Sequence, residues 1–184
     1  DPALRSRLLL RAAEIWANKN DIDRALGLVD RALAILPGNR SALRARQRHQ
    51  VRAGRVDEAR KSLLDLVEHA PEEAFETWIE IANLDELRRK NARDAVAAYR
   101  AAARLRPEHP LPRVAIVRLY RALADWERLV VALKALVDEE QDVFERAMLQ
   151  VQIAEVQEVC LADDDSALAS LEAADRDFIK AFEG

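Results

Sequence analysis

The chain has 184 residues and a formal net charge of −4, and this length allows one sizeable domain or a short repeat array. With only four glycines, six prolines and 5% aromatic residues, its composition favours helix over strand. No apolar run approaches the roughly 18 residues that a membrane-spanning helix needs, and the single cysteine, Cys160, excludes an internal disulfide framework and a cysteine-based zinc site. We therefore expect an all-α protein in which Cys160 is a small buried residue.

One design recurs along the chain. The stretches 23–39, 57–73 and 93–109 each combine an acid or arginine, a small alanine, an apolar stripe at helical spacing and a proline near the end. Two further copies, without the proline, begin at residues 127 and 165. The landmark positions are separated by 34, 36, 34 and 38 residues and are Ala25, Ala59, Ala95, Leu129 and Ala167. A spacing of this regularity predicts five copies of one structural unit.

A second helical stretch precedes each copy, so the predicted unit is a helix, a tight turn and a helix. Several turns contain Asp or Asn, as in "KNDID", "AGRVD" and "LADDD", and these side chains can accept hydrogen bonds from the first amides of the second helix. Proline then ends that helix, because it cannot continue the hydrogen-bond ladder. A start at Asp1-Pro2 without a signal segment predicts an excerpt of a longer protein. Localisation stays open, with the cytoplasm as the default.

This pattern resembles the tetratricopeptide repeat (TPR) family, whose motif is W-x2-L-G-x2-Y, then A-x3-F, then P. The first copy matches it with Leu9, Ala12, Ala13, Trp16, Ala25, Val29 and Pro37. The third matches it with Trp78, Ile81, Ala82, Ala95, Tyr99 and Pro107. No copy has glycine at the close-packing position of the first helix, so the repeats are divergent. The resemblance implies a right-handed α-solenoid whose first helices line a concave face.

On this basis the chain is expected to be a single repeat domain over residues 1–184. The expected repeats are approximately 5–38, 39–73, 74–108, 109–142 and 146–176, followed by a C-terminal helical cap at 177–184.

Catalytic chemistry finds little support in the sequence. His69 and His109 sit at the ends of second helices, and no two histidines have the i, i+4 spacing of a helical metal site. The "DDD" run at 163–165 lacks the alternating ligands and the glycine of a calcium loop, which favours a capping role. No glycine-rich phosphate loop occurs either. We predict a non-enzymatic protein with no catalytic, cofactor-binding or metal-binding residues.

Charge is distributed unevenly along the chain. Residues 40–61 contain eight Arg or Lys against two acids, whereas residues 138–184 contain three against fourteen. Oppositely charged ends can steer a charged partner or let two copies associate end to end. A purely solvating role for these charges is the alternative.

Arginines at i, i+4 and i+8 share one face of the first helix of the second repeat. By the family's geometry this face belongs to the concave groove, and guanidinium groups there suit carboxylates or phosphates. The predicted partner-binding residues are Arg7, Arg11, Arg44, Arg48, Arg52, Arg118 and Arg121. They favour a scaffold that binds an acidic or C-terminal peptide segment of a partner protein.

Three alternatives to this scaffold remain. The family's carboxylate clamp for chaperone tails is matched in charge only by Arg7 and Arg11. Nucleic-acid binding through the Arg-rich helix 40–55 is disfavoured by an isoelectric point near 5.5 and by the absence of aromatic residues within that stretch. The chain could also regulate a catalytic or DNA-binding domain of a larger protein.

The same helix has polar residues at packing positions, namely Arg46, Gln47 and Gln50. Burying them without partners would be costly. The helix is therefore either a contact surface or a weak seam in the repeat stack.

Overall fold

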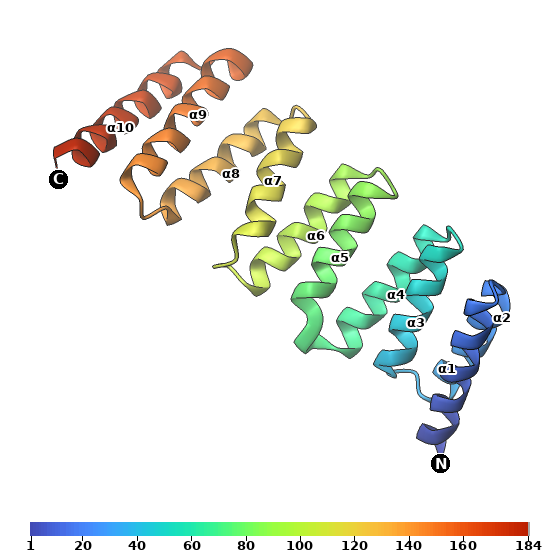
Figure 1. The fold of residues 1–184 in the computed structure, drawn as a ribbon. Coiled ribbons are helices and arrows are strands. Elements are labelled where there is room, and N and C mark those ends of the chain that lie inside the picture. Colours follow the sequence, from blue (N-terminus) through green and yellow to red (C-terminus); the bar gives the residue numbers. More distant parts are fainter. Residues whose placement is uncertain (184) are drawn as a thin grey trace. The chain divides into compact units, whose positions relative to one another are not determined.

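Residues 1–183 are described by a computed structural model (Figure 1), in which they form ten α-helices and one short 3-10 helix, with no strand. The helices pair in chain order as five hairpins. Their bounds are α1 Pro2–Asn18 with α2 Ile22–Ile35, α3 Arg40–Arg52 with α4 Val56–His69, α5 Ala74–Leu87 with α6 Ala92–Leu105, α7 Pro110–Ala122 with α8 Trp126–Glu139, and α9 Val143–Leu161 with α10 Asp164–Glu183; η1 Pro71–Glu73 precedes α5. The predicted all-α fold is confirmed.

Each hairpin turns at a single residue with a left-handed backbone. These residues have φ between 52° and 75° and are Asn20, Gly54, Lys90, Ala124 and Ala162. The amide that follows reaches back over the end of the first helix, as where Arg55 N donates to Gln50 O at 2.8 Å. The five turn residues are separated by the same intervals as the landmark positions, so the backbone conformation repeats with the same period as the sequence.

Side-chain caps start most of the second helices, as predicted. Asp21 Oδ1 accepts from Arg24 N at 3.2 Å, and Asn91 Oδ1 accepts from Asp94 N at 3.1 Å. Asp163 accepts from Ser166 N at 3.1 Å, so the acidic run 163–165 is confirmed as a capping element. Hydrogen bonding with the Ser166 side chain and with its backbone amide lowers the pKa of Asp163.

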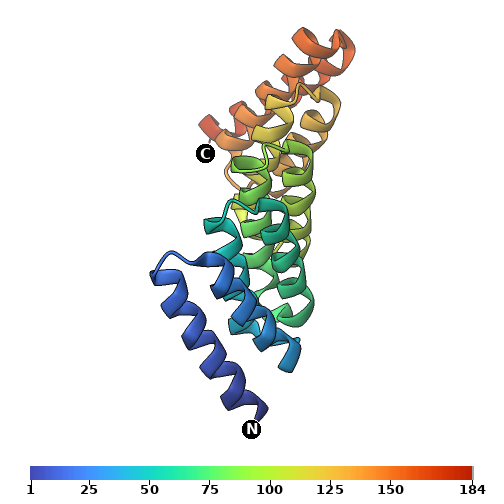
Figure 2. The same cartoon turned by 90° about the vertical axis from the view of Figure 1, so that its right-hand side faces the viewer.

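The landmark residues are all buried between the two helices of their hairpins: Ala25, Ala59, Ala95, Leu129 and Ala167. Their small size in four of five cases lets the helices approach closely, which explains why the sequence repeats alanine there. Figure 2 shows the paired helices of the first hairpin lying side by side. The core therefore recurs hairpin by hairpin.

The chain divides into two compact units, residues 1–108 (the N-terminal unit) and residues 109–184 (the C-terminal unit). Within each unit, the second helix of one hairpin packs on the first helix of the next: α2 on α3 and α4 on α5 in the N-terminal unit, and α8 on α9 in the C-terminal unit. This is the nearest-neighbour packing of repeat proteins.

The repeat boundaries expected from the sequence stay a prediction. Helices α1 and α9 begin before residues 5 and 146, and α10 runs through residue 177 to Glu183 without a break. Residue 184 of the expected cap lies outside the described residues.

The expectation that Cys160 is buried is wrong, because its side chain is exposed. It lies in the last turn of α9, next to the left-handed Ala162, where the helix end is open to solvent. Over residues 1–183, no helix combines the length and apolar character required to cross a membrane.

Candidate functional site: an arginine groove

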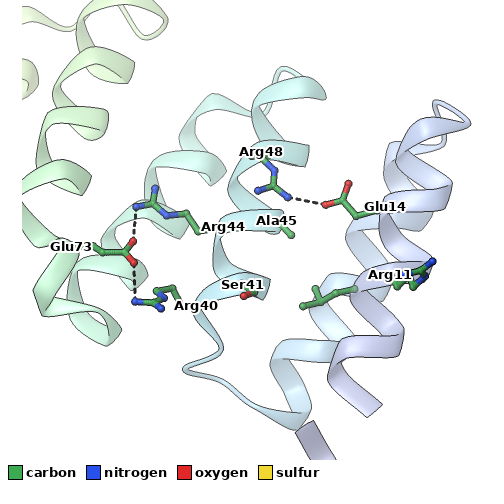
Figure 3. Close-up of a pocket in the computed structure, with 9 residues that line it drawn as sticks. Arg11, Glu14, Arg40, Ser41, Arg44, Ala45, Arg48 and Glu73 are labelled. Atoms are coloured by element: carbon green, nitrogen blue, oxygen red, sulfur yellow. Dashed lines mark hydrogen bonds and ion pairs between the residues drawn. The ribbon is translucent and has the colours of Figure 1, made fainter. Parts of the chain in front are cut away.

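A hollow of about 520 Å³ lies between the first helices of the first two hairpins (Figure 3). Both helices and the N-cap residue of α5 line it. Its lining, which we call the arginine groove, consists of Leu10, Arg11 and Glu14 of α1, Arg40, Ser41, Arg44, Ala45 and Arg48 of α3, and Glu73. The groove lies entirely within the N-terminal unit.

Helical spacing in α3 builds one wall of this groove. Arg40, Arg44 and Arg48 follow each other at four-residue steps, so their side chains stack along one face. The small Ser41 and Ala45 beside them leave the space open. Sequence reasoning found Arg44 and Arg48 but missed Arg40, although Arg40 continues the same four-residue spacing towards the N-terminus.

Arg44 is tied to α5. Its Nη1 donates to Glu80 at 2.7 and 2.8 Å, and its Nη2 donates to Glu73 at 3.0 Å. Burial opposes the charge on Arg44, but the ion pairs with Glu73 and Glu80 outweigh it and raise the pKa of the guanidinium. Because this part-buried side chain bridges two repeats, it stabilises their junction.

The outer arginines of α3 are themselves more exposed than Arg44. Arg48 Nη2 donates to Glu14 of α1 at 2.7 Å, and Arg40 Nη1 lies 2.8 Å from both Glu72 and Glu73. Dashed lines in Figure 3 mark the pairs of Arg48 with Glu14 and of Arg40 with Glu73. Exposed pairs of this kind typically contribute about 0–1 kcal/mol, so a competing anion can replace them at little cost.

The remaining predicted site residues are more scattered. Arg7 lies one turn before Arg11 on α1, and within residues 1–183 neither side chain has an ion pair or hydrogen bond. Arg52 donates to Asn20 Oδ1 at 3.3 Å, near the turn of the first hairpin. Arg118 and Arg121 belong to α7 in the C-terminal unit, where Arg121 donates to Gln152 at 3.3 Å. The structure thus brings Arg11, Arg44 and Arg48 together in one groove.

Sequence reasoning also missed the carboxylates of the groove, Glu14 and Glu73. The sequence separation of opposite charges could have identified these carboxylates, because ion pairs between neighbouring repeats join residues about one period apart. Arg48 and Glu14 are 34 residues apart, Arg44 and Glu80 are 36 apart, and Arg55 and Asp23 are 32 apart. Opposite charges at this separation would have identified the partners.

Two of the three polar residues at packing positions of α3, Arg46 and Gln50, have hydrogen-bond partners on α4. Ser62 Oγ donates to Gln50 Oε1 at 2.7 Å and accepts from Arg46 Nε at 2.9 Å, and Arg46 also pairs with Asp65. Gln47 is half-buried. Arg46 and Gln50 therefore bind α4 through a connected network. The same Gln–Ser contact recurs in the C-terminal unit between Gln157 and Ser170 at 2.7 Å.

His49 lies next to this network and is buried, and its Nε2 has no hydrogen-bond partner among the described residues. Burial lowers the pKa of the His49 imidazole, and the positive charges of Arg48 and Arg52 add to this effect against the attraction of Glu14. His49 is therefore a neutral packing residue.

The same described residues contain no group of three or more His, Cys, Asp or Glu side chains that could hold a metal ion.

Comparison with known proteins identifies the fold. No family model and no curated protein matches the chain. Among solved structures it is similar to MamA (41-end) from Desulfovibrio magneticus RS-1, with 12% identity, coverage of 96% of each chain and a TM-score of 0.53. It is also similar to YrrB, a TPR protein with an unusual peptide-binding site, with 14% identity, coverage of 92% of this chain and 84% of that chain, and a TM-score of 0.50.

A third similar structure is a tetratricopeptide repeat protein from Parabacteroides merdae ATCC 43184, with 17% identity, coverage of 95% of this chain and 66% of that chain, and a TM-score of 0.53. At these identities the likeness concerns the fold alone. Together with the five hairpins and their buried landmark residues, it establishes that the chain has the tetratricopeptide-repeat fold, built here from divergent repeats.

Proposed function

We propose that the protein is a non-enzymatic scaffold that binds an acidic segment of a partner protein in the arginine groove. The observation that carries this proposal is the lining of the groove, which contains four arginines and two glutamates and in which Arg11 has no ion pair among residues 1–183. A guanidinium group can hold a carboxylate through two parallel hydrogen bonds. A peptide with acidic side chains or a free C-terminus therefore complements this surface.

The groove arginines differ in their availability to a ligand. Arg44 is held by two glutamates of the α5 region, so it is not an exchangeable contact. Arg48 can exchange Glu14 for a ligand carboxylate, because its ion pair is solvent-exposed, and Arg11 has no competing partner within residues 1–183. The proposed contacts are thus Arg11, Arg40 and Arg48. Arg7 and Arg52 are proposed as flanking positive charges.

Arg118 and Arg121 are proposed as partner-binding residues independently of the arginine groove, because they belong to the C-terminal unit.

A peptide ligand is supported by analogy with YrrB, whose TPR fold carries a peptide-binding site.

Intramolecular pairing speaks against nucleic acid as the ligand. Every arginine of the 44–55 stretch has an acceptor within the chain: Arg44, Arg46, Arg48 and Arg55 pair with carboxylates and Arg52 with an amide oxygen. A phosphate backbone would need several of these contacts to break at once, whereas a short acidic segment needs only the exposed ones.

The test is fluorescence anisotropy with a labelled Asp- and Glu-rich peptide. Controls are the matching Asn and Gln peptide and a single-stranded oligonucleotide. We expect the acidic peptide to bind best, with an affinity that falls as salt is added. The double variant Arg11→Glu/Arg48→Glu should weaken binding by about tenfold or more, which corresponds to about 1.4 kcal/mol.

The matched control variant is Arg31→Glu/Arg104→Glu. It makes the same charge change on exposed positions of the second helices α2 and α6 and should leave the affinity within about twofold, a difference well below 1 kcal/mol. Equal binding of the acidic and neutral peptides, or equal losses in the two double variants, would contradict the proposal. Tighter binding of the oligonucleotide would favour the nucleic-acid alternative.

A further inference from the structure

The first and last helices each expose an apolar face. On α1, Leu8 and Ile15 are 61% and 52% exposed, and Leu4 continues this face towards the N-terminus. On α10, Leu168 and Phe182 are 59% and 79% exposed, and Leu171 and Ile179 lie between them. The spacing of each set places it on one side of its helix. We call Leu4, Leu8 and Ile15 the head face, and Leu168, Leu171, Ile179 and Phe182 the tail face.

Two residues of the tail face, Leu168 and Leu171, correspond to positions that are buried in other second helices. By the repeat register, Leu168 matches Leu26 of α2 and Val130 of α8, which are only 6% and 7% exposed. Leu171 matches Val29 and Leu133, which are also buried. Helices α2 and α8 are each followed by a helix that packs on them, α3 and α9 respectively. Leu168 and Leu171 therefore match apolar residues of second helices that receive a following first helix, and Ile179 and Phe182 extend this face along the longer α10.

The head face is the other half of the same kind of junction. Leu8 matches Ala42 of α3 and Thr77 of α5, and Ile15 matches His49 and Leu84 of the same two helices. All four of these counterparts are buried in helices that pack on a preceding second helix. Leucine and isoleucine at these positions of α1 are thus apolar residues of a repeat junction for which the described residues supply no preceding helix.

The charges within the two faces are complementary. Arg11 lies between Leu8 and Ile15, and Glu172 and Asp175 lie between Leu171 and Ile179. Among residues 1–183, none of these three charged side chains has an ion pair. An apolar contact between the faces would therefore bring opposite charges together.

We propose that the head face of one copy packs on the tail face of a second copy, so that α1 follows α10 as α3 follows α2 within the chain. The contact joins two different surfaces, and each added copy leaves one head face and one tail face free. Such head-to-tail contacts build open chains unless the array closes into a ring. The occupant of each face is thus another copy of this protein. This inference does not depend on peptide binding in the groove.

The test is sedimentation velocity over a range from low micromolar to near-millimolar protein. We expect a mass that rises with concentration. Leu8→Glu should block the head face and Leu171→Glu the tail face, and each variant alone should sediment as a monomer. A mixture of the two variants should form a one-to-one dimer and stop there, because only one intact head and one intact tail remain.

Charge reversal at Arg11 and Asp175 tests the same contact in a second, independent experiment. Arg11→Glu alone and Asp175→Arg alone should each weaken association, and the double variant Arg11→Glu/Asp175→Arg should restore it. Val131→Glu is the matched control, because Val131 is an exposed apolar residue on α8 outside both faces. Circular dichroism confirms that each variant is folded.

Several results would overturn the proposal. These are a wild-type monomer at every concentration, a mixture of head and tail variants that does not dimerise, or dissociation by Val131→Glu to the same extent. Association that only one of the two face variants abolishes would indicate a symmetric contact and would also overturn it. Peptide titration of the monomeric Leu8→Glu variant tests the groove separately.

Discussion

Substitution of Asp85 by asparagine should destabilise the N-terminal unit strongly. The Asp85 side chain is fully buried in α5 and accepts from Arg60 Nε at 2.9 Å through both carboxylate oxygens. It also accepts from Arg89 Nη1 at 2.7 Å. Arg60 lies on α4, so the carboxylate joins two repeats. The asparagine side chain would keep the volume but lose the negative charge that holds both guanidinium groups.

The size of the effect follows from these contacts. Each charge-assisted hydrogen bond contributes roughly 1.5–3 kcal/mol. Arg60 and Arg89 keep about a quarter of their side chains exposed and regain some hydration when the carboxylate is lost. We therefore expect a loss of about 3 kcal/mol, at the lower end of the roughly 3–5 kcal/mol typical for breaking a buried ion pair.

An apolar double substitution should recover most of this loss. Arg60 occupies the repeat position that holds Leu26 and Val130 in other hairpins, and both of those residues are buried. Arg60→Leu/Asp85→Leu removes both charges, and Arg89 keeps Asp57 and Asp94 as partners. Its stability should lie within about 1 kcal/mol of the wild type, because well-packed apolar residues can replace a buried ion pair.

Urea unfolding followed by circular dichroism measures these differences, and amide hydrogen exchange of α4 and α5 assigns them to this junction. Asp57→Asn is the matched control, because Asp57 is an exposed partner of Arg89. It should cost less than about 0.5 kcal/mol. Equal losses for Asp85→Asn and Asp57→Asn, or a double variant as unstable as Asp85→Asn, would refute this reasoning.

Three further substitutions test other features. Gly54→Ala should cost about 1 kcal/mol of stability in urea unfolding, because Gly54 has φ +75° and the added Cβ would meet no atom within 4 Å, so the cost is in the backbone alone. The pKa of His49 is lower in the folded chain than in the unfolded chain, so the unfolded chain binds more protons. The wild type should therefore lose stability as pH falls below about 6.5, by at most about 1.4 kcal/mol per pH unit. In thermal unfolding across pH, His49→Leu should reduce this dependence of stability on pH. The hydrogen bonds from Arg146 lower the pKa of Asp177, so their stabilisation is present above the ordinary pKa of 3.8 and is lost as pH falls through the folded value. Asp177→Asn should therefore lower the melting temperature at neutral pH and differ little from the wild type in strong acid.

The fold was predictable because its determinants are local and repeated. A small residue is needed where two helices of a hairpin cross, and a left-handed residue is needed where the chain turns. The small residue occurs in four of the five repeats and the left-handed residue in all five, so Ala25 and Asn20 have counterparts at the same intervals along the chain. Exposure at the helix ends is less regular, which explains why the burial expected for Cys160 was wrong.

The groove was only partly predictable because side-chain pairing depends on the neighbouring repeat. The four-residue spacing of Arg44 and Arg48 placed them on one face. Nothing within α3 itself indicates that Arg44 binds Glu80 of α5 whereas Arg48 binds Glu14 of α1. Those choices depend on which acid lies one period before or after the arginine, and thus on two helices at once.

This pairing also changes where the unbalanced charge lies. Counted along the sequence, residues 40–61 are the basic segment. In the folded chain, most arginines of this segment are matched by acids of the adjacent helices, as Arg40 and Arg44 are by Glu73, whereas Arg52 donates to the amide oxygen of Asn20. On α1, Arg7 and Arg11 carry positive charge without a partner among the described residues.

Unpaired acids remain on α10, at Glu172 and Asp175. Paired charges within the stack stabilise the junctions between repeats, whereas free charges at its first and last helices can act on other molecules. Salt should therefore affect association at α1 and α10 more than it affects the stability of the junctions, because exposed, separated charges are screened most strongly.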